Sequence, residues 1–149
     1  MIEWRWTDLD EFTPRQLYAL AAARIEVFVV EQNCVYQELD GLDLVARHLT
    51  GWSEGNVAAY LRVLGPDTRF AEPSIGRIIT TRAFRGTGIG RTLVALGVEE
   101  AERLYPAQPV RISAQAHLQR FYGAFGFVTD SDEYLEDGIP HVEMLRSPR

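Results

Sequence analysis

The sequence is poor in residues that bind metals or form cross-links. Among 149 residues it has no lysine, one cysteine and three histidines. Cys34 has no partner for an internal disulfide, and His48, His117 and His141 are too widely spaced to form a recognisable set of metal ligands. We therefore expect no metal cofactor.

Long apolar runs and excess positive charge are missing as well. No stretch approaches the roughly 18 apolar residues of a membrane-spanning helix, and charged Glu3, Arg5 and Asp8 interrupt the N-terminus where a signal peptide would be apolar. The net charge of -6 argues against a nucleic-acid partner, because phosphate-backbone binding needs a concentrated basic surface. We expect a cytoplasmic protein without a membrane partner, forming one domain over residues 1–149, as a monomer or homodimer.

The charges that are present are unevenly distributed. Six arginines lie between positions 62 and 91, whereas five acidic residues lie between positions 26 and 43, including Glu31, Asp40 and Asp43. This pattern suits an anionic cofactor and a cationic acceptor, although solvated surfaces of opposite charge are an equally good explanation.

The most informative motif is a glycine-rich loop between an apolar stretch, Ile75 to Thr81, and a segment of helical periodicity. The loop reads Arg85-Gly86-Thr87-Gly88-Ile89-Gly90-Arg91. Alternating glycines let the backbone turn sharply and bring amide groups together before a helix, and the flanking arginines can bind phosphate oxygens. The loop lacks the lysine of a P-loop, and Arg91 stands where a dinucleotide-binding motif requires a third glycine. We therefore predict a pyrophosphate site; an ordinary strand-to-helix connection is the alternative.

Hydrophobic periodicity predicts a mixed α/β sheet with helices on its faces. Thr13 and Pro14 resemble an N-cap and first residue of a helix, and Asp137-Gly138 has the composition of a hairpin turn. The predicted strands are 2–6, 46–52, 56–64, 75–81, 110–114, 126–128 and 141–145, and the predicted helices are 14–30, 89–104 and 118–125.

Several motifs together resemble the ElaA-like branch of the GNAT superfamily of N-acetyltransferases. They are Arg24-x-x-Val27-Phe28-x-x-Glu31-Gln32, Arg85-x-x-Gly88-x-Gly90, Tyr122-x-x-x-Gly126-Phe127 and the segment Tyr134 to His141. The resemblance covers nearly the whole chain and implies a central mixed sheet flanked by helices, with acetyl-CoA as the acyl donor. It further implies that the main chain of Ile78, Ile79 and Thr80 pairs with the pantetheine arm, and that residues Arg85 to Arg91 hold the pyrophosphate.

The resemblance also assigns a chemical role to Tyr122. The phenol occupies the family's general-acid position, from which it can protonate the departing coenzyme A thiolate, and an ordinary phenol near pKa 10 roughly matches a thiol. The alternative is an aromatic side chain packed beside Phe121 and Phe125. Gln115 stands where many relatives have Asn, and its amide can contact the cofactor or substrate.

The acceptor amine must lose a proton before it attacks a thioester, so a base or a water chain is required. The candidates are Glu31, His48 and His141, and the expected acceptor-binding residues are Glu31, Asp40, Asp43 and His141. For each of them a structural role is at least as good an explanation.

The leading hypothesis is transfer of an acetyl group to a primary amine by direct attack. A GNAT-fold module that binds acyl-CoA without turnover is a second hypothesis, and an enzyme resembling acyl-homoserine-lactone synthases is a third, because these also have an upstream Arg before Val-Phe-x-x-Glu-Gln. Nothing in the sequence chooses among a peptide N-terminus, a lysine, a polyamine, an amino sugar and an antibiotic as acceptor.

Overall fold

A computed structural model describes residues 1–149 as one eight-stranded mixed sheet with the strand order β1-β2-β3-β4-β5-β8-β6, in which β7 pairs with β8. The strands are β1 (Glu3–Asp8), β2 (Arg47–Ser53), β3 (Asn56–Leu64), β4 (Ser74–Thr80), β5 (Val110–Gln115), β6 (Phe127–Thr129), β7 (Tyr134–Glu136) and β8 (Ile139–Arg146). The α-helices are α1 (Pro14–Ile25), α2 (Ile89–Leu104) and α3 (Gln119–Gly123). The predicted mixed sheet with flanking helices is confirmed.

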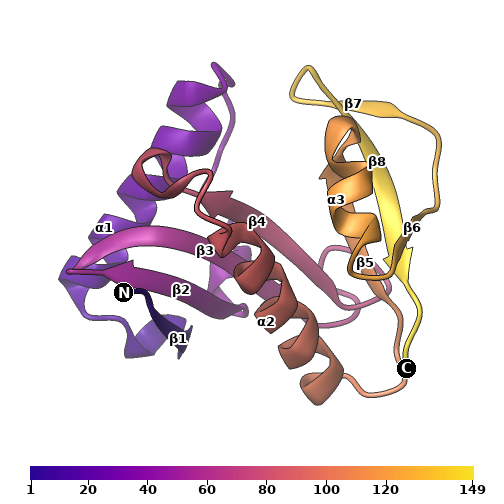
Figure 1. The fold of residues 1–149 in the computed structure, drawn as a ribbon, viewed down its shortest axis with the longest axis horizontal. Coiled ribbons are helices and arrows are strands. Elements are labelled where there is room, and N and C mark those ends of the chain that lie inside the picture. Colours follow the sequence, from indigo (N-terminus) through magenta and orange to yellow (C-terminus); the bar gives the residue numbers. More distant parts are fainter.

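Alternating side chains of β3 place a helix on each face of the sheet. Ala59, Leu61 and Val63 belong to the main core with α2, whereas Tyr60 belongs to a second core with Leu20 of α1. Successive strand residues point to opposite faces, so one fully buried strand serves both layers. Figure 1 shows α2 in front of β3 and β4, with α1 behind the sheet.

The sheet divides between β4 and β5. These parallel strands share a single register pair, Ser74 with Arg111, whereas β5 and β8 pair over six positions. Figure 1 shows the β1–β4 half and the β5–β8 half approaching each other near the C-terminal end of α2 and diverging toward α3 and η2. The main-chain groups of β4 beyond Ser74 therefore have no strand partner on the β5 side.

An irregularity in β4 accompanies this division. The register of β3 against β4 shifts between Tyr60 and Arg62, and Arg77 has φ 52°, in the left-handed region. A non-glycine residue is uncommon in that conformation, which costs roughly 1–3 kcal/mol. The bulge bends β4 away from β5.

The first helix follows the prediction at its start and differs at its end. Thr13 caps α1 by accepting a hydrogen bond from the Gln16 amide at 3.1 Å, as its position before Pro14 predicts. After Ile25 the chain continues as a π-helix, η2 (Glu26–Glu31), which the apolar periodicity did not reveal.

The C-terminal elements are shorter and more numerous than predicted. The expected helix 118–125 is a 3₁₀ turn, η5 (Ala116–Leu118), followed by the five residues of α3. The three-residue β7 was not predicted as a strand, and β8 begins directly after the predicted Asp137-Gly138 turn. Short 3₁₀ turns also occupy η1 (Leu9–Glu11), η3 (Leu42–Leu44) and η4 (Arg82–Phe84). None of the helices is both long enough and apolar enough to cross a membrane.

Candidate active site

The glycine-rich loop joins η4 to the N-terminus of α2. Gly86 and Gly88 have φ values of 78° and 85°, and Gly88 is the N-cap of α2. A Cβ atom added to either glycine would meet no other group within 4 Å, so the loop backbone is open to a ligand on that side. Unpaired amides at a helix N-terminus favour an anion, and this cradle therefore fits a pyrophosphate group.

A cavity of about 330 Å³ extends from this loop along β4. Its lining includes Ile78, Ile79 and Thr80 and most of the loop, while Phe121 and Tyr122 of α3 close the far side. Thr87 is the exception among the loop residues, because its hydroxyl donates to the Phe84 carbonyl at 2.6 Å and shapes the turn instead. This first cavity, which we call the donor cavity, holds the predicted cofactor residues other than Thr87 and Gln115.

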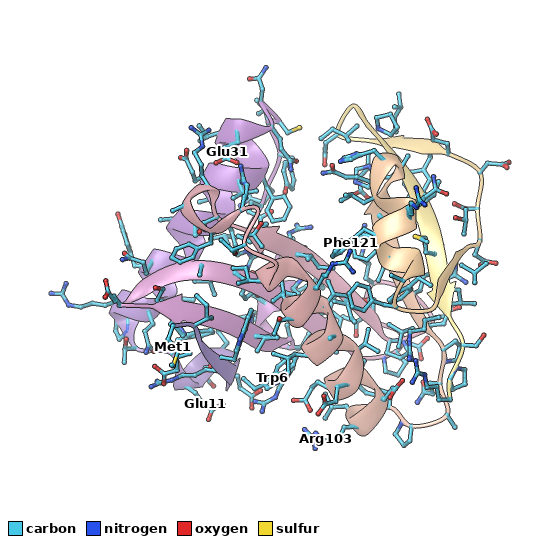
Figure 2. All side chains as sticks on the ribbon, in the orientation of Figure 1. Met1, Trp6, Glu11, Glu31, Arg103 and Phe121 are labelled. Carbon is cyan, nitrogen blue, oxygen red and sulfur yellow. The ribbon has the colours of Figure 1, made fainter.

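The ion pairs of Glu31 tie the end of η2 to this loop. Its carboxylate accepts a hydrogen bond from Arg85 at 2.5 Å and lies 3.8 Å from Arg82. The Arg85 guanidinium also donates to the Thr80 carbonyl at 3.1 Å. Figure 2 shows Glu31 at the end of the η2 region and Phe121 on α3, across the opening between the two halves of the sheet.

A second cavity of about 420 Å³ lies on the other side of Tyr122. It is bounded by β4, β5, the β7–β8 hairpin and the segment that follows η2, and we call it the acceptor cavity. It shares three lining residues with the donor cavity: Ile78, Leu118 and Tyr122. The two cavities therefore meet at Tyr122.

Tyr122 is buried, with 7% of its surface exposed, and its ring packs edge-on against Phe121 with centroids 5.1 Å apart. Burial raises the pKa of its hydroxyl to about 12. The expectation of a phenol near pKa 10 is therefore wrong for this position, and the group stays protonated well into the alkaline range. The coenzyme A thiol would also have a raised pKa in the same desolvated place, so the pKa values of the phenol and of the thiol would again be similar.

His48 lies in a different environment from the one predicted. It is completely buried in β2, with Nδ1 2.5 Å from the Tyr60 hydroxyl and Nε2 3.0 Å from the Asp43 carbonyl. Burial lowers its pKa, and both ring nitrogens already have partners. This geometry contradicts the expectation that His48 faces an acceptor amine, because β1 and β3 cover the edges of β2, Phe12 packs on the ring and Asp43 of η3 contacts Nε2.

Glu31 is likewise not placed to accept a proton from an amine. It lines neither the donor cavity nor the acceptor cavity, and its carboxylate is occupied by Arg85. Arg24 and Glu31, seven residues apart in the sequence, do not contact each other, as their spacing along the helix predicts.

The acidic segment 38–43 is neutralised by arginines from other elements. Arg24 is 2% exposed and pairs with Glu38 at 2.7 Å and with Asp43 at 2.8 Å. Arg62, 1% exposed, donates to Asp40 at 2.7 Å and to Asp43 at 3.0 Å. A third guanidinium, from Arg77, adds 2.9 Å and 3.2 Å contacts to the Glu38 and Asp40 carboxylates.

This network overturns the prediction that Asp40 and Asp43 attract a cationic acceptor. Burial alone would raise the pKa of both carboxyls, but hydrogen bonds and charges from arginines outweigh it and hold the pKa of each below its usual range. Three carboxylates face three guanidiniums, so little net charge is left for a ligand. The basic and acidic stretches of the sequence neutralise each other, and only Asp40 of this segment's acidic residues lines the acceptor cavity.

Several polar groups that line the acceptor cavity come from the C-terminal strands. His141 of β8 stands directly opposite Gln115 of β5 in the register. Its Nδ1 lies 2.7 Å from the Ile139 carbonyl and its Nε2 lies 3.4 Å from Glu136. Sequence reasoning missed Glu136 and Asp137, although the turn signal at Asp137-Gly138 already placed them at the tip of a hairpin.

A split sheet, an open glycine-rich loop at a helix N-terminus and two cavities joined at one tyrosine define the acyl-CoA N-acyltransferase class of fold. Structural comparison supports this class. A crystal structure of an acyl-CoA N-acyltransferase from Pseudomonas aeruginosa superposes with a TM-score of 0.93 at 47% identity, covering 99% of this chain and 100% of that chain.

Sequence comparison identifies the family. The model of the acetyltransferase (GNAT) domain matches residues 9–147. Protein ElaA of Escherichia coli is 45% identical over 98% of this chain and 97% of its own length, and its crystal structure superposes with a TM-score of 0.93. The chain therefore belongs to the GNAT acetyltransferase family.

A more distant similarity concerns the fold alone. A CoA-dependent acyl-homoserine lactone synthase, BjaI, superposes with a TM-score of 0.79 at 15% identity, covering 100% of this chain and 83% of that chain.

Proposed function

We propose that this protein transfers the acetyl group of acetyl-CoA to a primary amine by direct attack in a ternary complex. The observation that carries the proposal is the junction of the donor and acceptor cavities at Tyr122. A thioester held in one cavity and an amine held in the other can meet there without an intervening acyl-enzyme.

The donor cavity offers a place for each part of coenzyme A, which supplies the activated acyl group as a thioester. Amides of the loop from Gly86 to Gly90 face the pyrophosphate, and Arg91, which makes no ion pair within the protein, adds a free guanidinium. The unpaired edge of β4 at Ile78 to Thr80 offers main-chain hydrogen bonds to the pantetheine amides, as an added strand would.

Tyr122 is the proposed general acid. Its hydroxyl has no hydrogen bond to another protein group and lies at the cavity junction, so it is free to donate a proton to the departing thiolate. Gln115 lines the acceptor side of the same junction, where its amide can orient the acyl carbonyl or the incoming amine.

The proposed acceptor remains a cationic amine, but the attracting carboxylates differ from those expected. Glu136, the last residue of β7, and Asp137, on the turn that follows, line the acceptor cavity. Glu136 pairs with Arg69 at 2.8 Å, whereas Asp137 makes no ion pair. Asp137 therefore replaces Asp40 and Asp43, which the arginine network already neutralises, as the carboxylate that can attract the amine.

The direct test is a screen of amines for thiol release from acetyl-CoA, with acetylated products identified by mass spectrometry. The panel contains a peptide N-terminus, a lysine peptide, a polyamine, an amino sugar and an aminoglycoside, each paired with an acidic analogue. Because the chain has no lysine, any acetyl-lysine formed belongs to the acceptor. Preferred turnover of the cationic member of each pair supports the proposal.

Two other functions give different results in the same screen. A non-catalytic acyl-CoA-binding module would bind acetyl-CoA, seen by calorimetry, without releasing thiol from any amine. An acyl-homoserine-lactone-synthase-like enzyme would require a carrier-protein or long-chain donor with S-adenosylmethionine. The similarity to BjaI supports only a shared fold, so we rank this function below acetyl transfer.

A further inference from the structure

The geometry points to His141, held by Glu136, as the group that accepts the proton from the acceptor amine. This inference rests on the proposed function, because it assigns a missing step of the same reaction. It replaces Glu31 and His48, which do not line the acceptor cavity.

The hydrogen bond of His141 determines which of its two ring nitrogens can accept a proton. Nδ1 lies 2.7 Å from the Ile139 carbonyl, which can only accept, so Nδ1 carries the hydrogen. In the neutral ring this leaves the lone pair on Nε2. Nε2 faces the Glu136 carboxylate at 3.4 Å, where a second proton would have a negative partner.

The Glu136 carboxylate is held in place by its other oxygen. Oε1 accepts from Arg69 at 2.8 Å and from the Ser113 hydroxyl at 3.4 Å, which leaves Oε2 for His141. The Tyr134 ring stacks on the imidazole with centroids 6.1 Å apart, and its hydroxyl contacts Ser113. The pair is therefore oriented from both β5 and β7.

The position of His141 relative to the cavity junction is set by strand register. His141 and Gln115 are directly opposite on β8 and β5, so both side chains leave the sheet on the same face. Both line the acceptor cavity that ends at Tyr122. The acceptor cavity thus contains both groups: His141 as the proton acceptor on the side of the amine, and Tyr122 as the proton donor on the side of the thiol.

The proposed step conserves protons and electrons. The ammonium group of the acceptor gives one proton to Nε2, and its lone pair then forms the new C–N bond at the thioester carbonyl. The C–S bond breaks with its electrons on sulfur, and Tyr122 supplies the proton that neutralises the thiolate. The nitrogen of the new amide then gives up its second proton, which returns Tyr122 to the phenol. The imidazolium passes its proton to solvent through the side of the cavity where Glu136 is partly exposed.

Other titratable and charged groups lie around the imidazole. Glu136 and Tyr134 contact it from β7, and Asp137 on the turn lines the same cavity. Asp40 and Arg77 line the same cavity from the opposite wall, but both belong to the neutralised network. Glu136 is the only one of these with an atom within ion-pair distance of the ring.

The test combines a pH–rate profile with an NMR titration of the three histidines. His117 is exposed on η5 and lines neither cavity, so His117→Gln is a matched control that should leave kcat/KM unchanged. We expect His141→Gln to lower kcat/KM by roughly 10²-fold or more and to abolish the acid inflection of the profile. Glu136→Gln should move that inflection and the NMR midpoint of His141 together.

Chemical rescue distinguishes a catalytic role of His141 from a structural one. In His141→Ala, added imidazole should restore part of the rate with a dependence on the concentration of neutral imidazole, which a purely structural role would not produce. Coenzyme A affinity should be unchanged in all these variants.

Two results would overturn the assignment. One is an acid inflection that persists in His141→Gln. The other is a His141 imidazole that keeps one protonation state over the whole pH range of activity, a finding that does not depend on turnover. By contrast, normal titration of His141 with no amine turnover at all would contradict the proposed acetyl transfer itself.

Discussion

Of the three residues shared by the two cavities, only Tyr122 has a side chain that can donate a proton. Ile78 and Leu118 shape the same junction with apolar groups. In the proposed mechanism the Tyr122 hydroxyl is the only proton donor at this junction, so its removal is the most discriminating single change.

We expect Tyr122→Phe to retain the fold and coenzyme A affinity and to lower kcat by roughly 10² to 10⁴. Steady-state kinetics with an identified acceptor measure this. Because burial raises the pKa of the phenol to about 12, the wild-type protein should show no loss of rate from Tyr122 ionisation below about pH 11. Tyr18→Phe, at an exposed position on α1, is the control. Equal kcat for Tyr122→Phe and the wild type, with chemistry rate-limiting, would remove Tyr122 from the mechanism.

Gly88 tests the pyrophosphate cradle. With φ 85°, any other residue is strained here, and the added Cβ occupies the side from which the ligand approaches. We expect Gly88→Ala to weaken coenzyme A binding by at least about tenfold, or about 1.4 kcal/mol, measured by calorimetry. Gly123→Ala on α3 adds the same methyl group at an ordinary φ and should leave the affinity unchanged. Unchanged affinity in both variants would place the pyrophosphate elsewhere.

At the scale of elements, the buried arginines fix the chain between η2 and β2. Arg24 of α1 and Arg62 of β3 hold the carboxylates of segment 38–43, and this segment forms one wall of the acceptor cavity. We therefore expect the network to hold this wall in place rather than to bind the substrate.

We expect Arg24→Met to reduce the free energy of unfolding by about 3–5 kcal/mol, because it removes a buried guanidinium that pairs with two carboxylates and leaves three carboxylates facing only two arginines. Urea denaturation measures the change, and Arg103→Met, on the exposed face of α2, should have little effect. If the two variants were equally stable, the network would not anchor the segment.

The same carboxylates give the wild-type protein a predictable pH dependence. The pKa values of Asp40 and Asp43 are lower in the folded than in the unfolded protein, so the stability that they contribute is present above the unfolded pKa of about 4 and is lost progressively as the pH falls below it toward the folded values.

Local patterns in the sequence predicted the elements that depend on local chemistry. Thr13-Pro14 located the start of α1, and the glycine-rich loop located the start of α2. The π-helix, the bulge at Arg77 and the three-residue β7 escaped prediction because they arise from strand pairing and packing rather than from periodicity. The site shows the same division. The sequence located the glycine-rich loop that lines the donor cavity, whereas the burial of His48 and the pairing of Asp43 with Arg24 and Arg62 depend on distant contacts.

At the scale of the whole molecule, both halves of the sheet contribute to each cavity. The β1–β4 half with α2 carries the loop, the edge of β4 and the segment that follows η2, whereas the β5–β8 half carries α3 and the hairpin with His141 and Glu136. In the proposed reaction, both ligands must be bound between the two halves at once.

We expect initial rates to show sequential kinetics, with intersecting double-reciprocal lines when both substrates are varied. Mass spectrometry of the protein after incubation with acetyl-CoA alone should detect no acetylated side chain. Parallel lines together with a trapped acetyl-protein would instead indicate a covalent intermediate and would contradict direct attack.

The separation of β4 from β5 also has a consequence for backbone exposure. Beyond Ser74, the amides of β4 that face β5 have no strand partner. In the free protein these amides should therefore exchange with deuterium faster than paired amides inside a sheet. Saturating coenzyme A should slow exchange in the peptide covering Gly76 to Thr80, while the peptide covering β2, already paired on both edges, should change little. In this sense the fold contains an interrupted sheet, and the acyl donor is expected to act as its missing strand.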